Sequence, residues 1–226
     1  NWTNGKFFLP YLDVYDNNDG TATIVADAQS LNLEDIKLIE DVMVSTSGSN
    51  GQLGILDTLM VQSDSSAYSI VHTRLNSQYL GLNSSLAIIS AQLEFSRTAA
   101  VSTASMLSLH SNNDQDWVEN EATWNNYANG QSWVNGGTNS IGFASNTLLM
   151  ADQPSDKFSF SIEDTIQSSL NYPLKDGLEF TMLNNPGDES ISSSPNDISF
   201  ASTENADALK QPKVRITYML SQSNSV

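Results

Sequence analysis

The chain has 226 residues, of which 39% are hydrophobic, no cysteine, and a formal net charge of −17 from 9 Lys and Arg against 26 Asp and Glu. This length and apolar content suffice for one domain with a buried core, and they exclude wholesale disorder. The lack of cysteine excludes disulfides, cysteine-ligated metal sites and a thiol nucleophile, and the negative charge disfavours nucleic acids and anionic membranes as partners.

The sequence predicts an extracellular or cell-surface protein in its mature form. No run of about 18 apolar residues is present, so we expect no transmembrane helix and no membrane insertion. The first residues lack the basic start and the apolar run of a signal peptide. The abundance of Ser, Asn and Thr fits export, and glycosylation sequons begin at Asn1 and Asn83. These sequons are weak support, because such short triplets also arise by chance.

The first elements predict a β-hairpin. Residues 6–15 are aromatic and β-favouring, with Pro10 placing them at a sheet edge, and residues 21–28 form the partner strand. The sequence DNNDG at 16–20 is a strong turn signal. Its spacing is not that of an EF-hand loop, so an ordinary turn is the favoured interpretation. The alternative is a Ca²⁺ site, for which the candidate ligands are Asp13, Asp16, Asn18 and Asp19.

Further segments have the apolar patterns of β-strands. The clearest alternation runs over 86–97, where we expect Ile89, Ala91, Leu93 and Phe95 on one apolar face. A short turn after residue 31 is expected to lead into a strand near 39–44. The remaining strand candidates are 56–63, 67–75, 104–111, 157–163, 177–183, 197–202 and 213–220.

The order of these elements predicts the fold class. Asp164 is placed to cap a short helix that ends near Leu170. Many short strands separated by turn signals are typical of a sandwich or a jelly roll. We therefore expect an all-β protein, an antiparallel β-sandwich of jelly-roll type with one short helix and an N-terminal hairpin extension. The expected divisions are a β extension over 1–37, the sandwich over 38–220 and a polar tail over 221–226.

The segment WVENEATWNN at 117–126 joins two β-rich halves. Its tryptophans stand among Asn, Thr and Glu, a composition that does not suit a helix face. We expect an ordered loop pinned by two indoles, each with a buried ring and a partner for its N–H. The residues expected to maintain the shape of this loop are Trp117, Glu119 and Thr123.

From about Glu40 to Tyr218, the order of the pieces resembles the DNRLRE domain family, extracellular β-sandwich modules related to a group of carbohydrate-binding modules. The most specific resemblance is the Trp-x-Glu…Thr-Trp-Asn pattern in WVENEATWNN. It is supported by EDVMV…GQLGILDTLMVQS, LAIISAQLEF, IEDTIQSSL, DGLEFTML and ISFASTENADALKQPKVRITY. The chain departs from the family at Thr73 and Arg74, where an aromatic residue and an aspartate are usual. The segment before residue 38 has no counterpart.

No recognisable catalytic motif is present. His72 and His110 lie on separate expected strands without a Ser or Asp motif, which favours structural roles. Glu119 and Glu121 are neighbours in a loop and give no indication of a pair facing a glycosidic bond, so we expect them to bind backbone N–H groups. The HEXXH, nucleophile-elbow and P-loop patterns are missing. We expect that the protein is not an enzyme.

Two functions remain open. The resemblance implies a non-catalytic carbohydrate-binding or cell-surface module, with a polysaccharide or cell-surface glycan as partner. Trp133, in a Gly/Asn-rich stretch, is the best candidate for an exposed ring, and Trp117 is expected to be a structural wedge. The alternative is a structural subunit of an extracellular filament, in which segment 6–15 adds as a strand to the sheet of an identical subunit. The candidate sugar-binding residues are Trp124, Asn125, Tyr127 and Trp133.

Overall fold

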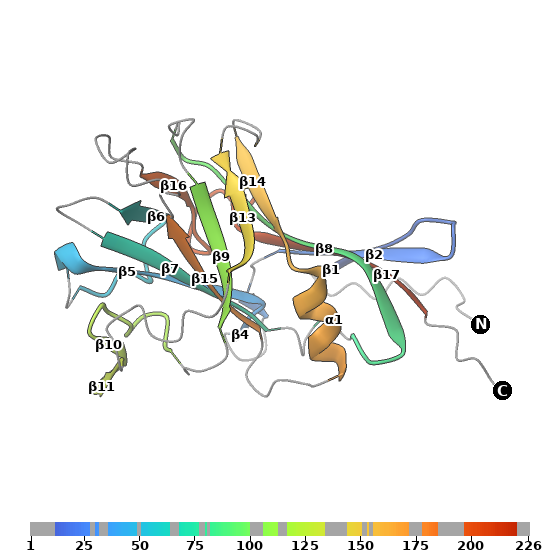
Figure 1. The fold of residues 1–226 in the computed structure, drawn as a ribbon, viewed down its shortest axis with the longest axis horizontal. Helices are drawn as coiled ribbons and strands as arrows, with labels where there is room; N and C mark the ends of the chain where they lie inside the picture. Colours follow the sequence, from blue (N-terminus) through green and yellow to red (C-terminus); the bar gives the residue numbers. More distant parts are fainter. Residues whose placement is uncertain are drawn as a thin grey trace.

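The computed structural model of the protein describes residues 12–27, 30–31, 36–48, 51–63, 68–76, 80, 82–99, 106–112, 117–133, 144–150, 153, 156–171, 178–184 and 197–220. Within these residues the protein is built from antiparallel β-sheets and a single α-helix (Figure 1). The two large sheets contribute to one apolar core, and the chain passes repeatedly from one sheet to the other. The expected all-β sandwich with a short helix is confirmed.

The five-stranded sheet has the order β1-β2-β17-β8-β14. Its strands are β1 Leu12–Asp16, β2 Thr21–Asp27, β17 Lys213–Leu220, β8 Leu86–Ser96 and β14 Lys157–Ser161. Strands β1 and β2 form the expected hairpin, and Asn18 and Gly20 in its turn have φ angles of 58° and 87°. Residues 6–11 of the expected first strand lie outside the described residues. Because β2 also pairs with β17 along its whole length, the hairpin continues the sheet of the sandwich.

The seven-stranded sheet has the order β13-β9-β15-β7-β6-β16, and β5 pairs with β7. Its strands are β5 Ile39–Ser45, β6 Thr58–Ser63, β7 Tyr68–Leu75, β9 Met106–Asn112, β13 Ala144–Leu149, β15 Leu178–Asn184 and β16 Ile198–Ala201. Every strand of this sheet except β13 was expected from the sequence. Smaller elements are β3 Ser30–Leu31, β4 Ile36–Lys37, the 3₁₀ turn Thr46–Gly48, β10 Asn126–Ala128 and β11 Gln131–Ser132.

The core lies between the two sheets and is mainly apolar; the register places the buried Asp41 and Thr73 on the same face of β5 and β7 as Met43 and Val71. Alternate residues of β8, β17 and β14 meet alternate residues of β7, β15 and β9, as a pleated strand with one face on a core requires. At its centre the ring of Phe95 stacks on Phe158 at 5.4 Å and meets Phe200 edge-on at 5.1 Å. An isolated bridge between Arg97 and Phe200 also ties the end of β8 to β16. The two sheets are therefore joined by backbone contacts as well as by the core.

The expectation that Ile89 lies in the core is wrong. Its side chain is 47% exposed, whereas Ile88 is buried with Ala91 and Leu93. The register between β8 and β17 shifts here, since Ser90 pairs with Thr217 but Ile88 pairs with Tyr218. The extra residue on β8 is a β-bulge, which reverses the alternation of the strand and turns Ile89 outward.

The helix α1 spans Glu163–Asn171 and closes one edge of the core, where Ile166 is buried. Asp164 lies inside the first turn rather than at the cap position expected from the sequence. There its negative charge interacts favourably with the positive end of the helix dipole. Gln167 Oε1 accepts a hydrogen bond of 2.8 Å from the N–H of Ile88, which anchors the helix to β8. Among the described residues no helix is long and apolar enough to cross a membrane.

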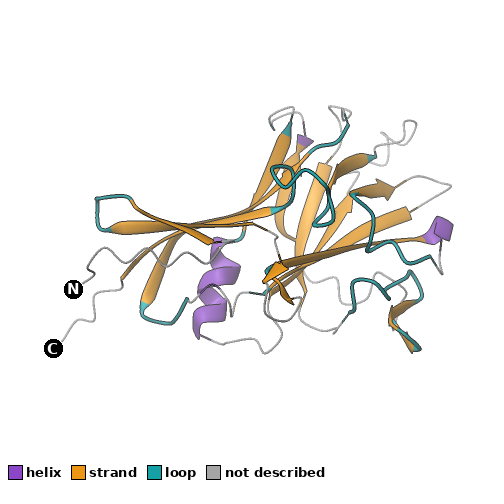
Figure 2. Ribbon diagram, turned by 180° about the vertical axis from the view of Figure 1, so that it is seen from behind, coloured by secondary structure: helices purple, strands orange, loops and turns teal. Residues whose placement is uncertain are grey.

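The β1–β2 hairpin and the short β10–β11 pair lie at opposite ends of the long axis of the molecule (Figures 1 and 2). The hairpin projects beyond the seven-stranded sheet. The β10–β11 pair belongs to the tryptophan loop and lies beside that sheet. These two ends carry the residues that the sequence singled out for function.

Candidate functional site

The face of the seven-stranded sheet that is turned away from the core carries ordered rows of side chains. The register of β5, β7 and β15 places one residue of each strand side by side. One row is charged, another carries two polar residues beside a valine, and an apolar pair lies next to them. The rows are Glu40, Arg74 and Glu179; then Val42, His72 and Thr181; then Val44 and Ile70.

Residues 117–133 cover this outer face. The buried rings of Trp117 and Trp133 pack in one cluster with Val42, Val44 and Ile70. This cluster is separate from the core between the sheets. The loop is thus the second layer over one face of the sheet. Both faces of β5 and β7 are buried for this reason.

Trp133 is not an exposed ring, contrary to expectation. It is 5% exposed, it stacks on the buried His72 with ring centroids 5.0 Å apart, and its Nε1 donates a hydrogen bond of 2.8 Å to Thr123 O. His72 also has a structural role, because its Nδ1 lies 2.9 Å from Thr181 Oγ1. Stacking on an aromatic ring and a partner for the indole N–H favour burial over solvent exposure. Trp133 therefore holds the loop to the sheet.

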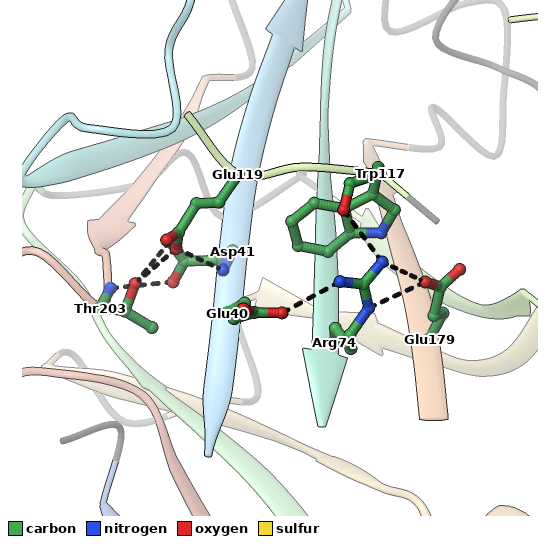
Figure 3. A network of polar contacts seen from close by, with 7 residues as sticks. All are labelled: Glu40, Asp41, Arg74, Trp117, Glu119, Glu179 and Thr203. Atoms are coloured by element: carbon green, nitrogen blue, oxygen red, sulfur yellow. Dashed lines mark hydrogen bonds and ion pairs between the residues drawn. The ribbon is translucent and has the colours of Figure 1, made fainter. Parts of the chain in front are cut away.

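Arg74 is the centre of a largely buried polar network (Figure 3). Its Nε and Nη2 donate to Glu179 Oε1 at 3.0 and 2.8 Å, and its Nη1 donates to Glu40 Oε2 at 3.1 Å. Nη2 also donates to Trp117 O at 3.0 Å, and the guanidinium lies 4.4 Å from the centroid of the Trp117 ring. These contacts combine a cation–π interaction with charge-assisted hydrogen bonds. Arg74 therefore clamps Trp117, which is 1% exposed, to three strands.

Glu119 fixes the loop on the other side of β5 (Figure 3). Its Oε1 accepts hydrogen bonds from the N–H of Asp41 at 3.1 Å and from Thr203 Oγ1 at 3.2 Å. The buried carboxylate of Asp41 accepts from Thr203 N at 2.9 Å and from Thr203 Oγ1 at 3.2 Å. One hydroxyl proton of Thr203 thus serves two carboxyl groups. The backbone of Gly54 lies against the same loop, since a Cβ on Gly54 would be 1.8 Å from Glu119 O.

Two further polar residues of the loop, Thr123 and Glu121, bind its own backbone. Thr123 Oγ1 accepts from Asn126 N at 3.1 Å, and Thr123 N donates to Asn126 O at 2.8 Å. Glu121 Oε2 accepts from Asn129 N at 2.9 Å. Local side-chain hydrogen bonds of this kind hold a loop in one conformation without helix or sheet.

Trp124, Asn125 and Tyr127 form the outer rim of the loop. Trp124 is half-buried and meets Tyr68 edge-on, with centroids 5.7 Å apart and an angle of 87° between the rings. Tyr127 is half-buried against Trp133, and its hydroxyl donates to Gln131 Oε1. Asn125, which lies between them in sequence, is exposed. Of the four expected sugar-binding residues, these three remain accessible to a ligand. Burial also raises the pKa of Tyr68, because it disfavours the phenolate.

The acidic residues of the hairpin turn bind the turn itself. Asp16 Oδ1 accepts from Asn18 N at 2.8 Å, and Asp19 Oδ1 accepts from the hydroxyl of Thr21 at 2.6 Å and its N–H at 2.9 Å. Hydrogen bonds from Thr21 lower the pKa of Asp19. Asp13 Oδ2 accepts from Tyr15 OH at 3.3 Å. In the part of the chain that is described, no group of three or more His, Asp and Glu residues is placed to hold a metal ion.

Sequence reasoning missed Arg74, Asp41, Thr203 and Gly54 as determinants of this site. A signal was available, because β5 and β7 contain apolar residues at consecutive positions, such as Val42 with Met43 and Ile70 with Val71. Consecutive apolar residues indicate a strand that is buried on both faces. They therefore required a covering layer outside the sandwich, and the tryptophan loop supplies it.

The fold and the site define a class of protein, an antiparallel β-sandwich with a tryptophan-bearing loop built onto one sheet face. No model of a known protein family matches the chain, and no curated protein matches it.

Proposed function

We propose that the protein is a non-catalytic extracellular module that binds carbohydrate, on a polysaccharide or a cell surface, through the rim of the loop. The observation that carries this proposal is the placement of Trp124 and Tyr127. Both rings are partly accessible, both are held by aromatic contacts, and the exposed Asn125 lies between them in sequence. An aromatic face packs on the C–H side of a sugar ring, and an amide binds its hydroxyls.

The rigidity of the loop supports this proposal. Trp117, Glu119 and Trp133 are held by the sheet beneath them, so the rim does not need to be ordered when a ligand binds. A binding surface that is ordered in advance loses less conformational entropy on binding. The loop carboxylates of Glu119 and Glu121 accept hydrogen bonds from backbone N–H groups, which supports a role in shape rather than in catalysis. The resemblance to the DNRLRE domain family points to the same function.

A glycan array followed by calorimetry tests the proposal. We expect the purified chain to bind at least one class of polysaccharide, and Trp124→Ala to weaken binding by about tenfold, equivalent to about 1.4 kcal/mol. Tyr15→Ala is the matched control, because Tyr15 is an exposed aromatic residue of β1, and the β1–β2 hairpin lies at the opposite end of the molecule from the β10–β11 pair. It should bind like the wild type. A chain that binds no sugar on the array, or equal losses in both variants, would contradict the proposal.

A second candidate function is assembly through the edge strand β1, and it has its own support. Among the described strands, β1 pairs only with β2, and its residues Val14 and Tyr15 are 52% and 53% exposed. An open edge can pair with a strand of another chain. A lysine in place of Val14 should block such pairing, so Val14→Lys should abolish any filaments seen by electron microscopy and leave the fold intact. Filaments that persist in this variant would exclude β1 as the assembly edge.

A further inference from the structure

The sequon Asn83-Ser84-Ser85 lies in an exposed turn that leads into β8. Leu86 N donates a hydrogen bond of 3.1 Å to Asn83 O, which closes the turn, and the side chains of Asn83, Ser84 and Ser85 are all exposed. An Asn-x-Ser triplet is an acceptor for N-linked glycans only where it is accessible at the surface of an exported protein. The structure meets the requirement for accessibility.

The carboxamide of Asn83 and the hydroxyl of Ser85 are in contact. Asn83 Oδ1 accepts a hydrogen bond of 2.9 Å from Ser85 N and a second one from Ser85 Oγ. Two donors on Oδ1 stabilise negative charge on that oxygen, and charge gathers there when the amide nitrogen loses a proton. The turn therefore places the hydroxyl where it favours the nucleophilic form of the Asn83 carboxamide.

A comparison with Asn125 shows what is specific to this site. Asn125 is exposed as well, but Tyr127 stands where a sequon has a serine or a threonine. Exposure alone does not distinguish Asn83 from Asn125. The sequon and its internal hydrogen bonds do.

We propose that Asn83 is the acceptor of an N-linked glycan on the surface of the folded protein. The donor is an oligosaccharide carried on a lipid diphosphate. Asn83 Nδ2 attacks the anomeric carbon, the new N–C bond forms as the bond from that carbon to the phosphate oxygen breaks, and the lipid diphosphate leaves with the electron pair. Nδ2 loses one proton to a base of the transferase. This inference requires export of the chain but not sugar binding by the loop rim.

The test uses the full chain, with a cleavable signal peptide added, translated in the presence of microsomes that carry an oligosaccharyltransferase. Only the chains protected from added protease are analysed, because they have been imported. Asn1→Gln is introduced throughout to remove the other sequon. We expect the imported Asn1→Gln chain to carry one glycan, which an N-glycosidase removes while it converts Asn83 to aspartate. Peptide mass spectrometry locates the change.

Two further variants separate the chemistry from the fold. Ser85→Ala keeps Asn83 but lacks the hydroxyl and should abolish the glycan, whereas Ser85→Thr restores a hydroxyl and should carry at least as much glycan as Ser85. An imported Asn1→Gln chain with unmodified Asn83 would overturn the proposal, and so would undiminished glycosylation of Ser85→Ala. The glycosylated chain should also melt at the temperature of Asn83→Gln. A large decrease for the glycosylated form would show that the folded surface does not accommodate a glycan there.

Discussion

The two faces of the seven-stranded sheet are buried in different ways. The inner face meets the other sheet mainly through apolar side chains, among them Phe180 and Met182, and makes one continuous core. The outer face is covered by a loop, and its rows include the ions of Glu40, Arg74 and Glu179. A loop lacks the regular backbone pairing of a second sheet, so directional contacts hold it in place. Burial of apolar surface at the inner face stabilises the fold, and the directional contacts at the outer face select one arrangement of the loop on the sheet.

The difference has a consequence for register. A shift of one residue between β7 and β15 would replace the contact of Arg74 with Glu179 by contacts with apolar neighbours. An unpaired charge under the loop is far more costly than an altered apolar contact. The charged row thus specifies the pairing of these strands, and four changes test how independent the two faces are.

The largest effect is expected in the inner core. Phe95→Ala removes a ring that contacts Phe158 and Phe200, and it should lower the free energy of unfolding by about 4 kcal/mol. Ile89→Ala on the same strand is the control, because Ile89 is turned outward by the bulge and should have little effect. Chemical denaturation measures both. Similar losses in the two variants would mean that the bulge is absent in solution.

The next effect concerns the charged row. Arg74→Met leaves Glu179 and Glu40 without their cation and should cost about 3 kcal/mol. Arg74→Lys should be destabilising too, but less than Arg74→Met, because a lysine keeps the positive charge but cannot make the paired contacts to Glu179 Oε1 and Trp117 O. Replacing both glutamates with glutamine in the Arg74→Met background should restore much of the stability. No restoration would show that the guanidinium acts mainly by packing on Trp117.

A smaller effect is expected where the loop touches Gly54. Gly54→Ala places a methyl group against Glu119 O, so the loop must move, at a cost of about 2 kcal/mol. Gly20→Ala is the control, since Gly20 has a φ of 87° but open space around it, and it should cost about 1 kcal/mol through backbone strain alone. Limited proteolysis should cut within 117–133 in the first variant only. Cutting in both would indicate that the loop opens whenever the sandwich is weakened.

The smallest effect is a dependence on pH at the rim of the loop. Burial raises the pKa of Tyr68 above 10.0, so the phenol ionises first in the unfolded chain. Its contribution to stability is complete below pH 10 and decreases as the pH rises through the higher pKa of the folded state. Tyr68→Phe should reduce the loss of stability as the pH rises above 10. Burial also raises the pKa of Tyr218, so some loss should remain.

Alternation in the sequence predicted most strands of the sandwich, because a strand with one face on a core repeats every second residue. It placed Ile89 wrongly, since a bulge depends on pairing with β17 and leaves no local mark. It did not predict β13, because Ala144–Leu149 has no strand-like pattern of its own and forms a strand through its pairing with β9.

The site was harder to predict than the fold. The Gly/Asn-rich surroundings of Trp133 indicate exposure, but the ring stacks on His72 and donates a hydrogen bond to Thr123 O. His72 is far away in the sequence, and nothing in the local pattern indicates the contact with Thr123. The role of Glu119 in binding backbone N–H groups was expected from its residue type, whereas its partners Asp41 and Thr203 depend on the whole topology. Contacts between residues far apart in the chain cannot be derived from local patterns.

The pairing of β2 with β17 affects how the protein is made. The hydroxyls of Thr23 and Thr217 are 2.9 Å apart across this pair, although 194 residues separate them in the chain. On a ribosome, Thr23 must wait until 194 further residues have been added before its partner in the sheet exists. Strand pairing over such a separation slows folding. The open side of β2 is therefore exposed until β17 has been made, and a chaperone that shields strand edges would act during that interval.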